Sequence, residues 1–168
     1  MMDSKHVLLT GATGLVGRSL LQALAQRGMQ VTALTRRVSR EANRGDGIVF
    51  VAWDGTSPPA DAFDGVDVVV HLAGEPIFGG LPTPRRKQRM HASRVESTRA
   101  IVSQIEALPA ASRPAALVCA SAVGIYGDRG NEWLDETSPP GRGFLPALCE
   151  DWEREAERAQ VLGTAVVR

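Results

Sequence analysis

Short apolar runs alternate with amphipathic segments along the 168 residues of the chain. The apolar runs have the length of strands and predict six of them, at residues 5–10, 31–35, 48–53, 67–73, 115–121 and 164–168. Apolar positions at helical spacing predict a first helix from Leu15 to a cap at Gly28. The same spacing predicts a long helix at residues 85–108 and an amphipathic helix at 149–162.

This alternation of strands and helices predicts an α/β fold, a doubly wound parallel sheet in three α/β/α layers. Right-handed crossover connections make 3-2-1-4-5-6 the expected strand order. Because 43% of the residues are hydrophobic, the chain can build one packed core, and we expect a single domain over residues 1–168.

A glycine-rich turn joins the first predicted strand to the first predicted helix. Gly11 permits a tight turn, Gly14 lets the backbone approach a pyrophosphate, and Gly17 allows close packing of the helix. The first N–H groups of the helix are free to bind an anion. The turn lies within a βαβ unit, so it predicts a Rossmann-type dinucleotide site. We assign the following residues of the turn to the cofactor: Gly11, Thr13, Gly14, Leu15, Val16 and Gly17.

The end of the second strand selects between NAD and NADP. An acidic residue there would hold the ribose 2′-hydroxyl of NAD, whereas arginine accommodates a 2′-phosphate. Thr35 is followed by Arg36 and Arg37, with no acid before Glu41. We therefore expect NADP(H), held by Arg36 and Arg37. Asp54, after the third strand, is either a partner for the adenine amino group or an Asx cap of its own loop.

Several further motifs occur in a recognisable order. They are His71-Leu-Ala-Gly-Glu-Pro-Ile, Ser93-Arg-Val-Glu-Ser-Thr, Ser121-Ala-Val-Gly-Ile-Tyr-Gly and Asp151-Trp-Glu. With the glycine-rich turn, they resemble the epimerase-family subgroup of extended and atypical short-chain dehydrogenases/reductases, a subgroup often labelled nucleoside-diphosphate-sugar epimerase. Full-length members of the subgroup are substantially longer. We therefore expect this chain to be a fragment that lacks a C-terminal substrate-binding part.

The resemblance implies roles for residues at the ends of the fourth and fifth strands. Ala73 and Gly74 would line the nicotinamide ribose, and Ser121 and Tyr126 would face the nicotinamide as catalytic residues. An alignment that places Ala122 at the serine position is equally open. Tyr126 is otherwise a packing residue whose hydroxyl bonds to a neighbour.

The chain departs from the resemblance in the catalytic pair. Active members use a Tyr-x-x-x-Lys pair as general acid and base. Here Cys149 stands near the tyrosine position and Glu153 near the lysine position, and the only tyrosine is Tyr126. Two functions follow. One is an NADP(H)-dependent oxidoreductase or epimerase of a small hydroxyl or carbonyl compound, nucleotide sugars included. The other is a non-catalytic NADP(H)-binding redox sensor.

Other side chains have two interpretations each. Cys149 is a thiol acid or a small hydrophobe. Glu75 is a substrate contact or a solvated loop charge. The basic run Arg85-Arg86-Lys87 with Arg89 is a solvated first helical turn, or a site for a phosphate-bearing substrate. His71 lies inside a strand and is expected to be a satisfied core residue.

Composition narrows the range of binding partners to be expected. Nineteen basic and nineteen acidic residues give zero net charge, which offers no footprint for nucleic acid or an anionic membrane. No apolar run reaches the ~20 residues of a membrane span. The histidines lack partners at metal-ligand spacing, so we propose no metal site. Two cysteines fit a reducing cytoplasm, and a small-molecule substrate and a homodimer are the expected partners.

Overall fold

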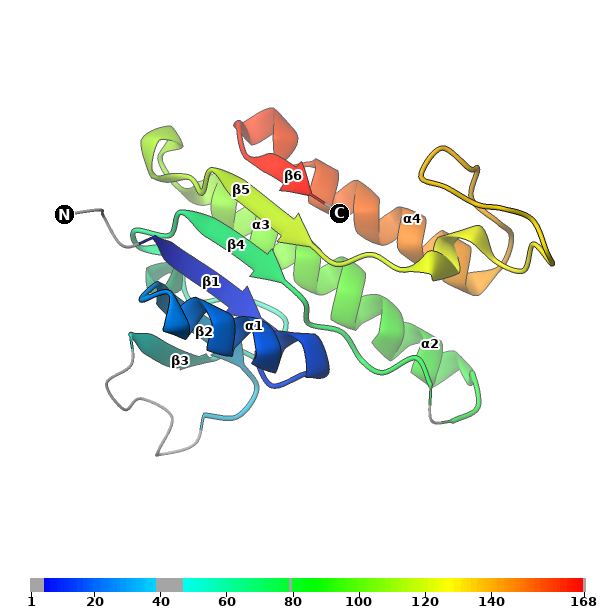
Figure 1. Ribbon diagram of the computed structural model, residues 1–168, viewed down its shortest axis with the longest axis horizontal. Helices are drawn as coiled ribbons and strands as arrows, with labels where there is room; N and C mark the ends of the chain where they lie inside the picture. Colours follow the sequence, from blue (N-terminus) through cyan, green and yellow to red (C-terminus); the bar gives the residue numbers. More distant parts are fainter. Residues whose placement is uncertain (1–4, 39–46, 79, 168) are drawn as a thin grey trace.

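A computed structural model describes residues 5–38, 47–78 and 80–167 of the chain. Its six strands form one parallel sheet in the order β3-β2-β1-β4-β5-β6, as the crossover rule predicts. The strands are β1 (His6–Thr10), β2 (Gln30–Thr35), β3 (Ile48–Ala52), β4 (Val68–His71), β5 (Ala116–Cys119) and β6 (Ala165–Val167). Figure 1 shows them side by side, with β1 next to β4.

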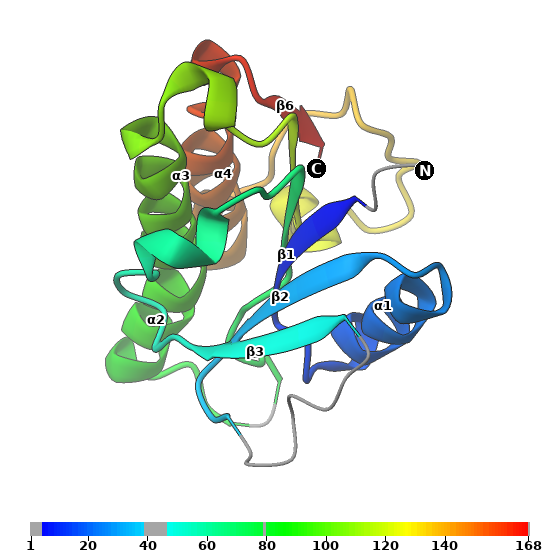
Figure 2. The ribbon, with the colours of Figure 1, turned by 90° about the vertical axis from the view of Figure 1, so that its left-hand side faces the viewer.

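Helices cover both faces of the sheet and complete the three predicted layers. They are α1 (Leu15–Gln26), α2 (Pro84–His91), α3 (Ser97–Ala107) and α4 (Phe144–Glu157). In Figure 2, α1 lies on one side of the sheet, and α2, α3 and α4 lie on the other. Short 3-10 turns occupy Ala60–Phe63 (η1), Ala110–Ser112 (η3), Val123–Tyr126 (η4) and Gln160–Leu162 (η5). Within the described ranges, no helix combines the length and apolarity of a bilayer span.

Each face of the sheet has its own apolar core. The α1 side packs Val7, Leu9 and Val31 with Leu24 of the helix. The other side is larger, and most of its members come from β1, β4, β5, η1, α3 and α4. They include Leu8, Phe63, Val69, Ile101, Ile105, Leu117, Leu148 and Trp152. Successive residues of β1 therefore point to opposite cores, because side chains alternate along a strand.

Two predicted helices differ from the structure. The stretch predicted as one helix at 85–108 is α2 and α3 joined by a π-helical turn, Ala92–Glu96. The helix predicted at 149–162 starts at Phe144, just after Gly143, which has φ +116°. Pro146 lies in its first turn, where no intrahelical N–H bond is needed. The helix therefore begins five residues earlier than predicted.

Candidate cofactor site

A cavity of about 360 Å³ opens at the carboxyl ends of β1, β2, β3 and β4. The strand order reverses between β1 and β4, and open α/β sheets bind their ligands at such a point. The described residues that line it are Gly11, Thr13, Gly14, Leu34, Thr35, Arg36, Trp53, Asp54, Gly55, Leu72, Ala73, Gly74, Glu75, Pro76, Ser93 and Ser97. Seven of these are among the predicted cofactor residues. Leu15, Val16, Gly17 and Arg37, also predicted, are not part of this lining.

Local geometry requires glycine at Gly11 and Gly17, whereas Gly14 borders the cavity. Gly11 has φ +69°, and a Cβ there would lie 2.7 Å from the Leu72 carbonyl carbon. A Cβ on Gly17 would lie 2.1 Å from the Gly11 carbonyl oxygen, so Gly17 packs α1 against the turn itself. A Cβ on Gly14 would lie 3.2 Å from the same oxygen and would stand at the cavity. The turn is therefore shaped for close backbone approach.

The N-terminus of α1 supplies anion-binding groups next to this turn. Gly14 is the N-cap and has no side chain to bond the first N–H groups. The first intrahelical bond runs from the Arg18 N–H to the Gly14 carbonyl. Leu15 and Val16, in the first turn of α1, are therefore placed to offer their backbone N–H groups to a phosphate.

Arg36 and Asp54 stand on the cavity wall beyond β2 and β3. Arg36 lines the cavity, whereas the exposed Arg37 follows it in a turn held by the Thr35 hydroxyl. The Asp54 carboxylate accepts from the Thr56 N–H at 2.9 Å and from its hydroxyl at 2.6 Å, and these bonds lower the pKa of Asp54. The Asx interpretation of Asp54 is thus observed, while its carboxylate still lines the cavity. Glu41, the first acid after β2, lies outside the described residues.

A buried chain of hydrogen bonds fixes the end of β4. The Thr10 hydroxyl oxygen accepts from the N–H groups of Leu72 and Ala73 at 3.2 and 3.1 Å. Its own proton therefore goes to His71 Nδ1, 2.7 Å away. His71 Nε2 then donates to Ser97 Oγ at 3.1 Å, and Ser97 donates to the Ser93 carbonyl. Burial lowers the pKa of His71 to about 4, so the ring is neutral, and it is the satisfied core residue that was predicted.

The loop between β4 and α2 is tied down by two residues of the basic run. Arg86 Nη2 donates to the carbonyls of Pro76, Ile77 and Phe78 at 3.0–3.1 Å. Arg89 Nε bonds both oxygens of Glu75, at 3.0 and 3.1 Å. Arg89 is solvated, with 60% of its side chain exposed. The guanidinium groups of Arg86 and Arg89 also bond backbone and carboxylate acceptors of the loop, which the solvated interpretation did not include.

A hydroxyl–carboxylate pair lies beyond β5. Ser121 Oγ donates to Glu153 Oε1 of α4 at 2.5 Å. Cys149, one helical turn before Glu153, is buried, and its Sγ lies 3.8 Å from the Ala122 carbonyl oxygen. Burial and the nearby Glu153 raise the pKa of this thiol, which agrees with the small-hydrophobe interpretation. Tyr126 ends η4 and is half-buried.

The structure brings forward residues that the sequence did not single out. Trp53 lines the cavity, and its indole N–H is buried without a partner among the described residues. Thr10 acts through a hydrogen bond across 61 residues of sequence, which no local pattern reveals. Ser97 belongs to a motif noted in the sequence, but its bond to His71, 26 residues away, was not predicted. One indication in the sequence pointed to Glu153, which stands near the lysine position of the absent Tyr-x-x-x-Lys pair. No group of three or more potential metal ligands occurs in the described part of the chain.

The glycine turn and the reversal of strand order define an α/β domain of the Rossmann class. A family model described as "NAD dependent epimerase/dehydratase family" matches residues 7–143. The chain therefore belongs to the NAD-dependent epimerase/dehydratase family, and its resemblance to epimerase-like short-chain dehydrogenases/reductases is confirmed.

Individual relatives show how much of a longer protein is matched. The chloroplastic SDR39U1 homolog of Arabidopsis thaliana, an epimerase family protein, is 37% identical over 91% of this chain and 44% of its own length. An epimerase family protein of Mycobacterium tuberculosis is 32% identical over 99% of this chain and 52% of its own. The chain spans about half the length of these curated relatives.

Solved structures share the fold. A nucleoside-diphosphate sugar epimerase from Corynebacterium glutamicum superposes with a TM-score of 0.78 at 34% identity, over 98% of this chain and 33% of that one. The human epimerase family protein SDR39U1, solved with NADPH, gives 0.73 at 28% identity, over 90% of this chain and 48% of that one.

Proposed function

We propose that the whole protein is an NADP(H)-dependent oxidoreductase or epimerase of a small hydroxyl or carbonyl compound. The observation that supports the cofactor is Arg36 on the wall of the cavity that begins at the glycine turn. A guanidinium group there suits a ribose 2′-phosphate. The similarity to a human relative solved with NADPH also favours the phosphorylated cofactor.

The glycine turn and the start of α1 would hold the pyrophosphate, and Ala73 and Gly74 would border the nicotinamide ribose. When bound, the nicotinamide supplies or accepts hydride. The remaining need is a group that moves the proton of the substrate oxygen.

We assign the transfer of that proton to the Ser121–Glu153 pair. The Ser121 hydroxyl donates to Glu153, so its oxygen is free to accept the proton of a substrate hydroxyl. As that proton arrives at Ser121 Oγ, the serine proton moves to Glu153 Oε1, and the reverse transfer would serve carbonyl reduction. The pair thereby replaces the absent Tyr-x-x-x-Lys pair. Tyr126, at the end of η4, is the alternative acid.

The second candidate is a redox sensor that binds NADP(H) without chemistry. The absence of a Tyr-x-x-x-Lys pair favours it, since the only tyrosine of the chain is Tyr126. Both candidates require the same cofactor site. They differ in whether bound NADPH is consumed.

Calorimetric titration with NADPH and NADH tests the cofactor assignment. We expect NADPH to bind more tightly, and Arg36→Ala to remove about 1.5–3 kcal/mol of that binding, a typical value for a hydrogen bond to a charged group. The matched control is Arg27→Ala, an exposed arginine at the far end of α1. Equal affinities for the two cofactors in the parent chain would refute NADP specificity.

A further inference from the structure

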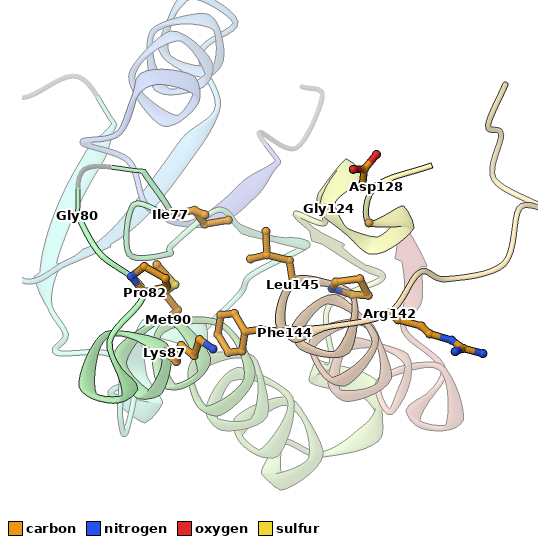
Figure 3. A pocket seen from close by; sticks show the side chains of 12 residues that line it. Ile77, Gly80, Pro82, Lys87, Met90, Gly124, Asp128, Arg142, Phe144 and Leu145 are labelled. Atoms are coloured by element: carbon orange, nitrogen blue, oxygen red, sulfur yellow. The ribbon is translucent and has the colours of Figure 1, made fainter. Parts of the chain in front are cut away.

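A second cavity, of about 500 Å³, lies beside the β4–α2 loop and separate from the cofactor cavity. Its walls come from that loop, from α2, from η4 and from the first turn of α4. Figure 3 shows the Ile77 and Leu145 side chains pointing toward one another across it, with Phe144 and Met90 below. A volume of this size is typical of a small-molecule site.

The cavity is apolar apart from one cation. The side chains of Arg142 and Asp128 contribute to the lining but point away from its centre in Figure 3. Lys87 is the exception, because its ammonium nitrogen lies 5.2 Å from the centre of the Phe144 ring. No salt bridge to Lys87 occurs among the described residues. The site therefore offers a positive charge at the rim of an apolar chamber.

The linings of the two cavities meet along the β4–α2 loop. Glu75 and Pro76 line the cofactor cavity, and Ile77, the next residue, lines the apolar one. On the opposite wall, Gly124 lines the apolar cavity three residues after Ser121. Ser121 itself lines neither cavity, and Gly124 is the lining residue nearest to it in sequence.

This lining is unsuited to a nucleotide sugar. Sugar hydroxyls and phosphate oxygens must exchange water for hydrogen-bond donors and acceptors, and burying them without such partners is unfavourable. Apart from Lys87, the side chains that face the cavity are hydrocarbon or thioether groups. They gain free energy only by covering apolar surface.

We propose that the apolar cavity is the substrate site and that the substrate is an apolar carboxylic acid. Its hydrocarbon body would fill the space between Ile77, Leu145 and Phe144. Its carboxylate would lie near Lys87, and its hydroxyl or carbonyl group would lie toward Ser121. The inference rests on the proposed function, because it names the substrate class for the same reaction centre.

Methyl NMR of methionine-labelled protein tests this binding without any need for turnover. Met90 lines the cavity, whereas Met29 packs in the core on the α1 side of the sheet and serves as an internal reference. The probes are octanoate, 1-octanol and UDP-glucose, each titrated into the intact chain. We expect octanoate and octanol to shift the Met90 methyl signal in a saturable manner, with Met29 unchanged. UDP-glucose should leave Met90 where it is.

Two variants test whether Lys87 binds the carboxylate and whether the probes bind in this cavity. Lys87→Gln should weaken octanoate by about twofold to fivefold, the range for a partly exposed ion pair, and leave octanol unaffected. Gly124→Phe should block both probes, since a Cβ on Gly124 meets only Leu145, at 3.6 Å, and the ring would enter the cavity. Its matched control is Val123→Phe, at an exposed position of η4 outside the lining.

The outcomes separate this inference from the proposed function. A shift of the Met90 methyl signal with UDP-glucose and none with octanoate would refute the proposal that the substrate is an apolar carboxylic acid. Equal octanoate affinity in the parent chain and in Lys87→Gln would refute the proposed contact between the carboxylate and Lys87. Unimpaired binding of both probes in Gly124→Phe would refute the cavity as the binding site. Each of these results leaves NADPH binding intact in calorimetry. Failure of the parent chain to bind NADPH would instead refute the proposed function, whatever the NMR titration shows.

Discussion

Gly11, Gly14 and Gly17 meet three different requirements within one turn. Gly11 needs its positive φ, and Gly17 needs the absence of a Cβ because the Gly11 carbonyl oxygen occupies that space. Gly14 has an ordinary φ of −75°, and the space beside it is the cavity rather than the protein interior. Only Gly14 is therefore expected to separate binding from folding.

Replacing Gly14 with valine should abolish NADPH binding while the fold persists. The added Cβ needs a shift of only a few tenths of an ångström at the Gly11 oxygen, but the branched side chain would occupy the space of the pyrophosphate. Calorimetry measures binding and circular dichroism measures folding. The control is Gly124→Val, which alters the other cavity. Normal NADPH binding by a folded Gly14→Val protein would show that the turn is not the phosphate site.

His71 makes stability depend on pH. Its pKa is about 4 in the folded protein, where burial disfavours the charged ring, against 6.5 for an ordinary histidine. Between pH 4 and pH 6.5 the unfolded chain binds more protons than the folded protein does. The contribution of the neutral His71 ring to stability is therefore complete above pH 6.5 and is lost as the pH falls toward 4. We expect a loss of about 2 kcal/mol in the free energy of unfolding between pH 7 and pH 5.

Urea unfolding at the two pH values measures this loss. His71→Asn is the comparison, because it removes the titrating ring from the Thr10–Ser97 connection. The variant is expected to be less stable at pH 7 and to lose less stability on acidification. If both proteins lose the same free energy between pH 7 and pH 5, another group is responsible.

Among the elements, the ones with a regular local pattern were predicted most closely. The strand order, α1 and its cap at Gly28 follow from apolar spacing and the crossover rule, and Gly28 does have φ +66°. The fourth and fifth strands are shorter than predicted, since β4 and β5 contain four residues each. Apolar residues continue past the last ladder bond, so composition overstates strand length.

Elements held by distant contacts were not predictable. The β4–α2 loop depends on the side chains of Arg86 and Arg89, whose charge pattern alone indicated a solvated helix. The π-helical turn inserts a wider turn where Ser93 and Ser97 both reach the cofactor cavity, and π turns are frequent at functional sites. Hydrophobic spacing averages over such a turn and predicts one continuous helix.

For the cofactor site, the sequence located the residues at strand ends and missed those that support them. Gly11, Gly14, Arg36, Asp54, Ala73 and Gly74 all line the cavity as the strand-end rule predicts. Trp53 and Ser93 line it as well. Nothing in the local sequence distinguishes Trp53 from a core residue, and the motif that contains Ser93 did not assign that serine to the cofactor. The Ser121–Glu153 bond joins residues 32 apart, and spacing alone cannot pair them.

At the scale of the molecule, the 168 residues correspond to about half of the curated relatives. We expect this chain by itself to bind NADPH without steady turnover. The parts of the relatives beyond the matched half would be needed to cover the substrate and exclude water. The test is NADPH absorbance with a panel of carbonyl compounds, including oxo acids and nucleotide sugars.

Steady consumption of NADPH would contradict that expectation and identify the acid. Loss of activity in both Ser121→Ala and Glu153→Gln would assign the proton to that pair. Loss in Tyr126→Phe alone would assign it to Tyr126. A control reaction without carbonyl compound corrects for slow oxidation of NADPH.

The neighbouring positions of β1 and β4 also constrain how the molecule assembles. Val7 pairs with Val68, so one edge of β1 stays open until about 60 further residues have been synthesised. An open strand edge of apolar sequence is a template for pairing with other chains. The closure of so long a loop is slow compared with the local pairing of β1 and β2. We therefore expect the nascent chain to be exposed to aggregation at this edge until β4 has docked.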